Sequence, residues 1–177
     1  MAAVDKQRLF FALWPTPAVR ERLAALTSDL PRRAGFRVPA ANLHITLVFL
    51  GGVDPETSQR VLAAAGDATG RTFRLRLDHS GYWPRPRVAW VGPHKVPPAL
   101  AGLQGALCAA LERAGVAYDR RPFVPHVTVA RDARAPLGLA PDRPIHWTVD
   151  AYALVESVTH PGGARYTVLQ TWPLRRR

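Results

Sequence analysis

The sequence predicts an α+β protein with a two-lobed, internally duplicated fold, in which antiparallel sheets face a central cleft and helices lie on the outside. Three observations support this prediction. The chain has 177 residues, the size of one compact domain. Strand-like and helix-like apolar patterns occur twice in the same order, and a His-x-Thr strand takes the same place in each half. We therefore expect a single domain over 1–177, with pseudo-repeats of about 1–84 and 85–177.

The first half opens with an apolar run that is typical of a buried strand. Thr16 can then cap a helix that carries Pro17 in its first turn. The expected elements are a strand over 8–14, a helix from 17 with the apolar stripe Val19, Leu23, Leu26 and Leu30, a strand over 44–49, a helix from 54–55 to about 65, and a strand over 73–78.

The second half repeats this pattern after a proline-rich turn over 82–86. The expected elements are a strand over 88–91, a helix from 97–98 with the apolar stripe Leu100, Leu103, Leu107 and Leu111, a strand over 126–129, a loop over 132–144, and strands over 145–156 and 165–172. The repetition predicts two halves that pack around a pseudo-two-fold axis.

Arginine dominates the charge of the chain. The net charge is +11, and among 24 basic residues only Lys6 and Lys95 are lysines. Because the planar guanidinium matches phosphate oxygens, this composition favours an anionic partner such as nucleic acid. Arginine used as an ordinary surface cation would give the same composition, so charge alone does not decide.

The cysteine content and the apolar runs indicate in which cellular compartment the protein is expected. Cys108 is the only cysteine, which excludes an internal disulfide and zinc fingers that need several cysteines. The apolar run near the N-terminus is too short for a signal peptide and ends at Pro15. No apolar run approaches the ~20 residues that a membrane span needs. We expect a cytoplasmic protein without membrane association, cofactor or obligate protein partner.

Two tetrapeptides, 44–47 (His-Ile-Thr-Leu) and 126–129 (His-Val-Thr-Val), carry the functional prediction. Alternate side chains of a strand share a face, so each histidine points the same way as its threonine while the aliphatic residues point into the core. Each strand thus offers one group that can move a proton and one hydroxyl that can donate to an oxyanion. If the pseudo-two-fold relates the strands, His44 and His126 converge on one ligand.

A third match, His146-Trp147-Thr148, breaks the repeat, because no corresponding strand and helix lead into it. We interpret His146 as one of several residues on a long sheet strand. His79, His94 and His160 lie in no motif and receive no role. The alternative for the two motif histidines is a hydrogen-bonded structural histidine in a sheet.

The segments around the two motif histidines resemble the signature motifs of the two-histidine phosphoesterases. They extend from Asn42 to Gly51 and from Arg121 to Arg131. Within that superfamily the chain is similar to the RNA 2',3'-cyclic phosphodiesterases, also called 2'-5' RNA ligases. The similarity includes the opening residues 8–12 and the closing residues 165–167.

The resemblance implies metal-independent hydrolysis of RNA 2',3'-cyclic phosphodiester ends to 2'-phosphomonoesters, with 2'-5' RNA ligation as the reverse reaction. It implies that His126 is the proton acceptor for water and that His44 is the proton donor to the departing 3'-oxygen. Thr46 and Thr128 would donate hydrogen bonds to the nonbridging phosphate oxygens. The near symmetry of the motifs does not by itself order the two proton roles.

The resemblance also places Arg131 at the phosphate and Phe49 at the nucleobase, each five residues after a motif histidine. Strict alternation puts that position on the opposite face from the histidine, so a bulge or a strand end must redirect both side chains. Gly51 and Gly52 make this easy for Phe49, whereas nothing obvious does so for Arg131. Otherwise Phe49 is a core residue and Arg131 is an ordinary surface arginine.

A metal site is the main competing use of paired histidines. No Cys, Asp or Glu lies within four residues of either motif histidine, so we expect no metal. Two other functions stay open: a phosphodiesterase for 2'-5' oligonucleotides or small cyclic nucleotides, and a nucleotide- or RNA-binding module. The intact histidines and threonines favour the enzyme, with RNA ends or nucleotide cyclic phosphates as partners. Binding of long RNA depends on whether these arginines share one rim: Arg32, Arg33, Arg37, Arg85, Arg87, Arg120 and Arg121.

Overall fold

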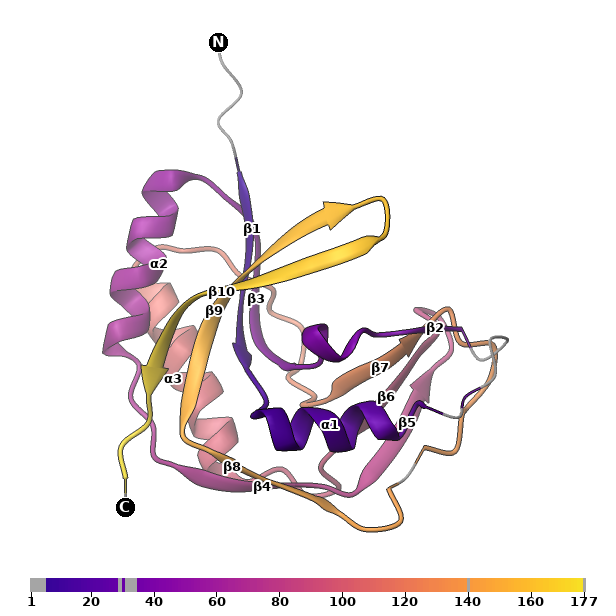
Figure 1. The fold of residues 1–177 in the computed structure, drawn as a ribbon. Coiled ribbons are helices and arrows are strands. Elements are labelled where there is room, and N and C mark those ends of the chain that lie inside the picture. Colours follow the sequence, from indigo (N-terminus) through magenta and orange to yellow (C-terminus); the bar gives the residue numbers. More distant parts are fainter. Residues whose placement is uncertain (1–5, 29, 31–34, 140, 177) are drawn as a thin grey trace.

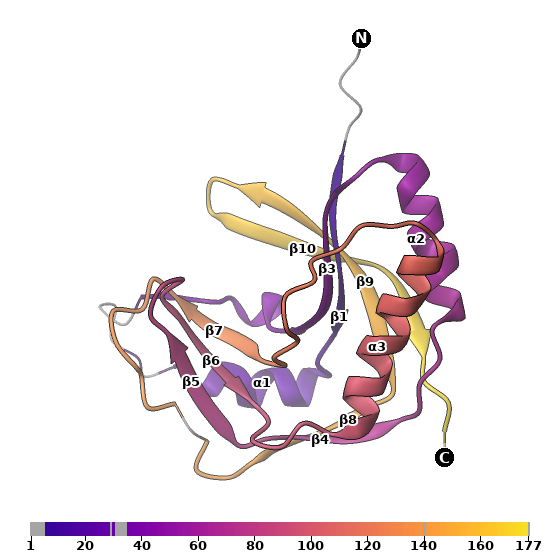
Figure 2. The same ribbon diagram turned by 180° about the vertical axis from the view of Figure 1, so that it is seen from behind.

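The computed structural model describes residues 6–28, 30, 35–139 and 141–176, and its fold class is α+β, as predicted (Figures 1 and 2). The helices in this part of the chain are α1 (Pro17–Ala25), α2 (Pro55–Asp67) and α3 (Pro98–Arg113). Each begins at a proline. Proline suits the first turn of a helix because the N–H that it lacks would have no intrahelical partner there. The α2 and α3 helices lie side by side on one outer flank of the molecule, in both views.

The strands of the described residues all pair antiparallel with their neighbours. They are β1 (Gln7–Leu13), β2 (Phe36–Arg37), β3 (Ile45–Val53), β4 (Phe73–Leu77), β5 (His79–Trp83), β6 (Val88–Gly92), β7 (Val127–Arg131), β8 (Ile145–Val149), β9 (Ala151–His160) and β10 (Gly163–Pro173).

The strands form one large sheet and one small sheet. The large sheet has the order β10-β9-β1-β3-β7-β6-β5, with β2 also paired to β7, and β4 and β8 form the small one. The two lobes of the large sheet, β10-β9-β1-β3 and β7-β6-β5, run in different directions in Figure 1. A single residue pair, Ile45 with Val127, joins them. The predicted facing sheets are therefore two lobes of one sheet, which meet at the start of the two motif strands.

The strand pairs β1–β3 and β6–β7, one in each lobe, have matching registers. In β1–β3 the Cα partners are Phe11–Val48, Ala12–Thr46 and Leu13–Ile45, and in β6–β7 they are Ala89–Ala130, Trp90–Thr128 and Val91–Val127. Both registers skip the residue after the motif threonine, Leu47 in β3 and Val129 in β7, which is the signature of a β-bulge. The same bulge at the same place supports the predicted pseudo-repeat.

Several elements differ from the sequence-based expectation. The expected strand over 145–156 is two strands, because the chain leaves the small sheet at Asp150 and enters the large one. The α1 helix ends at Ala25, although Leu26 and Leu30 still pack against the core. The turn over 82–86 begins later than expected, since β5 continues to Trp83. The sequence pattern did not predict β2, β5 or the 3-10 turn Ala40–Asn42.

The core lies between the sheets and the helices, and the first half of β9, over 152–155, is buried on both faces. The predicted α3 stripe is buried, with Leu100 and Leu107 fully inaccessible. On the cleft side, Phe10, Ala12, Ala153 and Val155 form a separate cluster, against which Trp14, Phe49 and Tyr166 pack. We call this set the cleft-side cluster. Among the described residues no helix is long and apolar enough to cross a membrane.

Candidate active site

The two histidine motifs meet where the lobes join. Ile45 and Val127 are Cα partners with fully buried side chains. In an antiparallel register, the residues flanking such a pair oppose each other crosswise and point to the other face of the sheet. This register sets each histidine beside the threonine of the other motif: His44 beside Thr128, and His126 beside Thr46.

Hydrogen bonds hold both ring nitrogens of His44. Its Nδ1 is 2.7 Å from the backbone oxygen of Asn42. Because a carbonyl oxygen only accepts, Nδ1 is the nitrogen that carries the proton in the neutral ring. Nε2 is 3.1 Å from the hydroxyl of Thr46. Three aromatic rings surround the imidazole: Trp14, stacked at a centroid distance of 5.7 Å, Phe10 at 4.9 Å, and the edge of Tyr166 at 5.2 Å.

His126 repeats this arrangement. Its Nδ1 is 2.7 Å from the backbone oxygen of Val124, which stands two residues earlier, as Asn42 does before His44. The ring of Trp83 meets it nearly at a right angle, with centroids 4.5 Å apart. Both imidazoles therefore have the same tautomer, and Nε2 of each is the nitrogen that can exchange a proton with a ligand.

Both imidazoles are weak bases in the ligand-free protein. Burial lowers the pKa of His44 from 6.5 to about 4, outweighing the hydrogen bond to Asn42, and the neighbouring His126 and Arg131 also lower it. Burial likewise lowers the pKa of His126, and Arg131 adds to this effect. Both rings are therefore neutral at neutral pH, and a bound anion would favour their charged forms.

Arg131 reaches the histidine face because of the β7 bulge. Thr128 is half-buried on the cleft side, Val129 and Ala130 are both buried, and Arg131 then emerges exposed. It lines the same pocket as His44 and Thr128. The redirection that the sequence left unexplained is thus a β-bulge.

The matching bulge in β3 turns Phe49 toward the cleft-side cluster. Leu47 and Val48 are both buried before it. The guanidinium of Arg8 lies 5.0 Å from the centroid of the Phe49 ring. Phe49 does not line the pocket that contains His44 and Arg131, so its contact with a base stays a prediction.

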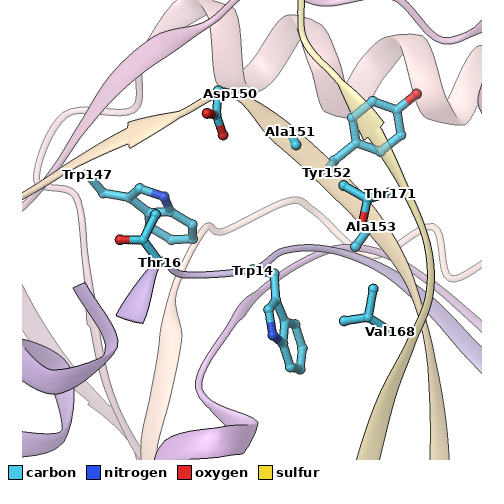
Figure 3. Close-up of a pocket in the computed structure, with 9 residues that line it drawn as sticks. All are labelled: Trp14, Thr16, Trp147, Asp150, Ala151, Tyr152, Ala153, Val168 and Thr171. Carbon is cyan, nitrogen blue, oxygen red and sulfur yellow. The ribbon is translucent and has the colours of Figure 1, made fainter. Parts of the chain in front are cut away.

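The pocket beside His44 has a volume of about 460 Å³, which is ample for a nucleotide. The segment 36–39, Asn42, Asp132, the hairpin tip 161–164 and Tyr166 complete its lining. Trp14 also lines a second cavity, with Trp147 and Tyr152, that measures only about 90 Å³ (Figure 3). The pocket beside His44 is the candidate ligand site because His44, Thr128 and Arg131 line it.

Residues remote in sequence complete the surroundings of His44. Asn42 donates from its side-chain amide to the backbone oxygen of Ala164 at 2.7 Å, while its own backbone oxygen accepts from His44. Tyr166 reaches the same ring from β10. In the sequence, the position of Asn42 two residues before His44 was the signal that could have pointed to its role. The contacts of Trp14, Trp83 and Tyr166 depend on strand order, which the sequence did not reveal.

The remaining histidines lie elsewhere. His146 is exposed on β8 and is the Cα partner of Arg76 on β4, in the small sheet. His79 begins β5 and His160 ends β9. Within the described ranges, no three His, Cys, Asp or Glu side chains are grouped so that they could hold a metal ion.

Of the arginines considered for RNA binding, Arg37 lines the pocket. Three others have acidic partners: Arg87 with Asp132, Arg120 with Glu112, and Arg121 with Asp119. Arg85 is exposed in the turn before β6. Arg32 and Arg33 lie outside the described residues.

His44, Thr128 and Arg131 line one pocket, and the register at Ile45 and Val127 sets His126 and Thr46 beside His44 and Thr128. Such a set of groups is typical of an acid–base site suited to a phosphate ester. The comparisons agree with this class. The family model of the 2'-5' RNA ligase superfamily matches residues 14–161. The chain belongs to this superfamily, which confirms the resemblance seen in the histidine motifs.

Individual relatives cover nearly the whole chain. The RNA 2',3'-cyclic phosphodiesterase of Escherichia coli (strain K12) is 36% identical, over 96% of this chain and 98% of that protein. The RNA 2',3'-cyclic phosphodiesterase of Thermus thermophilus is also 36% identical, over 95% of this chain and 90% of that protein. The crystal structure of E. coli LigT complexed with 3'-AMP has a TM-score of 0.87 at 35% identity, covering 96% of this chain and 98% of that one.

Proposed function

We propose that this chain is an enzyme that hydrolyses RNA 2',3'-cyclic phosphodiester ends to 2'-phosphomonoesters, with His44 and His126 as its acid and base. The names of its relatives support the reaction. One observation carries the assignment of residues: the crosswise pairing at the lobe junction, where two imidazoles with carbonyl-bound Nδ1 atoms share one face. A module that only binds nucleotides has no need of two such groups.

The reaction requires two proton transfers. Water attacks phosphorus while Nε2 of His126 accepts its proton, and Nε2–H of His44 protonates the departing 3'-oxygen. The P–O3' bond breaks and the phosphate remains on the 2'-oxygen. The weak basicity of His44 means that its proton must be taken up as the anionic substrate arrives.

Three side chains are proposed to bind the phosphate. The hydroxyls of Thr46 and Thr128 flank the histidines and can donate to nonbridging oxygens, an interaction worth about 3 kcal/mol per donor at the transition state. Arg131 supplies a positive charge that reaches both histidines. We propose Phe49 as the contact to the nucleobase and assign no metal to the reaction.

Ligation is the same chemistry in reverse. The 5'-hydroxyl of a second strand would replace water as the nucleophile and lose its proton to His126. The P–O3' bond breaks as His44 protonates the 3'-oxygen, which leaves a 2'-5' phosphodiester. Small cyclic nucleotides and 2'-5' oligonucleotides are the alternative substrates, because the pocket can admit a single nucleotide. We propose RNA ends as the physiological partner class and the cytoplasm as the compartment, which the lone Cys108 supports.

The test is incubation of an oligoribonucleotide ending in a 2',3'-cyclic phosphate, with EDTA present. We expect conversion to a 2'-phosphomonoester, identified by ³¹P NMR, with rates reduced about 10²–10⁴-fold in His44→Ala and in His126→Ala. Activity abolished by EDTA and restored by a divalent ion would overturn the mechanism. Nucleotide binding without turnover in the wild type would favour the binding module.

A further inference from the structure

The pocket extends past the phosphate-binding residues to an exposed aromatic ring. Phe36 is 73% exposed, the most exposed of the large hydrophobic side chains in the described chain, and it lines the pocket together with His44. It is the Cα partner of Arg131. Single exposed apolar residues are common on proteins, but this ring lies beside a positive charge within a pocket.

The backbone holds Phe36 in this place. Gly35 has a φ of +102°, and a Cβ there would lie 2.3 Å from the backbone oxygen of Arg131. Only glycine tolerates this approach. The N–H of Val38 donates to the oxygen of Val129 at 2.9 Å, so the chain after Phe36 is fastened to β7, with which Phe36 itself pairs. The position of the ring is therefore set by the same strand that carries Thr128 and Arg131.

Arg37 adds a cation to this end of the pocket. Its Nη1 donates to the backbone oxygen of Ser28 at 2.8 Å, which leaves further guanidinium N–H groups able to meet an anion. The hairpin tip lines the same pocket and includes Gly162 and Gly163. A Cβ at either glycine would contact nothing within 4 Å, so there is room beside this segment.

We propose that Phe36 and Arg37 form a second subsite, which binds the nucleotide on the 5' side of the cyclic end. The base stacks on Phe36, and Arg37 contacts the phosphodiester between the last two nucleotides. Arg131 has a side chain long enough to reach back toward Thr128, whereas the Phe36 ring is shorter. Phe36 pairs with Arg131 and Ile45 pairs with Val127, so about four residues of β7, roughly 13 Å at ~3.3 Å per residue, separate Phe36 from the strand that follows His44. That separation suits the neighbouring nucleotide rather than the reacting one.

This inference rests on the proposed function and identifies the preferred substrate as an oligonucleotide end rather than a free cyclic nucleotide. Stacking of one base on an aromatic ring corresponds to about a tenfold gain or more. We expect kcat/KM for a dinucleotide ending in a 2',3'-cyclic phosphate to exceed that for 2',3'-cyclic AMP by about this factor.

The experiment compares the two substrates in variants of the subsite. Phe36→Ala should lower kcat/KM about tenfold for the dinucleotide and leave that for 2',3'-cyclic AMP unchanged, whereas Phe36→Trp should preserve both. Arg37→Ala should reduce the dinucleotide rate and flatten its salt dependence. Leu169→Ala, which removes a side chain 42% exposed on β10, is the matched control and should affect neither substrate.

Unchanged 2',3'-cyclic AMP turnover shows that each variant is folded. Equal losses on both substrates in Phe36→Ala and Arg37→Ala, or no loss on the dinucleotide in either, would overturn the subsite. If the wild type hydrolyses neither substrate, the proposed function fails instead. The subsite is then tested by the affinities of 3'-AMP and of a dinucleotide 3'-monophosphate. Tighter binding of the dinucleotide than of 3'-AMP, with the difference lost in Phe36→Ala, supports the subsite. Equal affinities of the two ligands for the wild type refute it.

Discussion

His44 and His126 each donate their Nδ1 proton to a backbone carbonyl two residues earlier. The strand geometry therefore sets the tautomer, where a Ser-His-Asp triad uses a carboxylate. The hydrogen bond to the carbonyl raises the pKa of each imidazole, but burial outweighs it. This agrees with the pKa of His44, which burial lowers to about 4. His44 must then gain its proton as the anionic phosphate of the substrate binds, because the phosphate favours the imidazolium.

A pH profile tests this dependence. The kcat/KM profile reports the free enzyme, in which both histidine pKa values lie below 6.5. Falling pH protonates the base and rising pH removes the proton of the acid, so we expect a bell with both limbs below 6.5. The kcat profile reports the complex, and it should lie at higher pH because the phosphate favours imidazolium.

Initial rates with 2',3'-cyclic AMP across about pH 4–9 give both profiles. The pair is coupled, so its limbs are macroscopic values that belong to both residues. A kcat/KM profile whose alkaline limb lies above about pH 7 would contradict neutral imidazoles in the free protein.

The order of the two proton roles needs a different probe. In a cyclic substrate with sulfur in place of the 3'-oxygen, the leaving group is a thiolate. A thiolate needs little protonation to depart, because thiols have a pKa of about 8.5. If His44 is the acid, His44→Ala should lose about 10²–10⁴-fold on the oxygen substrate but stay within about tenfold of wild type on the sulfur substrate.

His126→Ala is the control for this assignment, since water must still lose its proton with either leaving group. It should be equally impaired on both substrates, as measured by release of thiol and of 2'-phosphate. Rescue of His126→Ala rather than His44→Ala by sulfur would exchange the two roles.

At the scale of elements, the paired bulges position the residues that strict alternation would misplace. Leu47 in β3 and Val129 in β7 each add one residue after the motif threonine, and Phe49 and Arg131 consequently turn back toward the cleft. A bulge re-aims a side chain without altering the strands on either side. The same five-residue spacing thus has the same structural cause in both lobes.

Arg131→Ala tests what the β7 bulge achieves. Removing a charged hydrogen-bond donor from the phosphate should lower kcat/KM for 2',3'-cyclic AMP about 10–100-fold. Arg76→Ala is a matched control, because Arg76 on β4 is also exposed but pairs with Asp78 in the small sheet, and its loss should change the rate less than about twofold. Comparable losses in the two variants would remove Arg131 from the site.

The elements that the sequence predicted are those with strong local signals. The three helices begin at their predicted prolines, and the strands β1, β3 and β7 carry clear apolar patterns. The two-residue strand β2 exists only because β7 offers it an edge. The break at Asp150 follows from a change of sheet. The aromatic rings around His44 come from β1, from Trp14 directly after it, and from β10, and their meeting depends on the tertiary strand order.

At the scale of the molecule, the site lies where the two lobes meet. One residue pair, Ile45 with Val127, links the two parts of the large sheet, and the motif histidines immediately precede it. Each lobe therefore contributes one imidazole and one hydroxyl. The core residues of both motifs are fully buried, so the geometry between His44 and His126 is fixed by packing on the side of the sheet away from the cleft.

The charge of the whole molecule leads to a prediction about substrate length. The net charge is +11, and each phosphate that a single strand places against an arginine steepens the log–log salt dependence of binding by about 0.7. We expect the slope of kcat/KM against salt to steepen from 2',3'-cyclic AMP to a decanucleotide with the same end. Replacing Arg32 and Arg33, which lie outside the described residues, should flatten the slope for the decanucleotide alone, whereas Arg131→Ala should weaken both substrates. Parallel salt slopes for both lengths would mean that only the terminal nucleotides touch the protein, and the arginine content would then have no role in binding RNA.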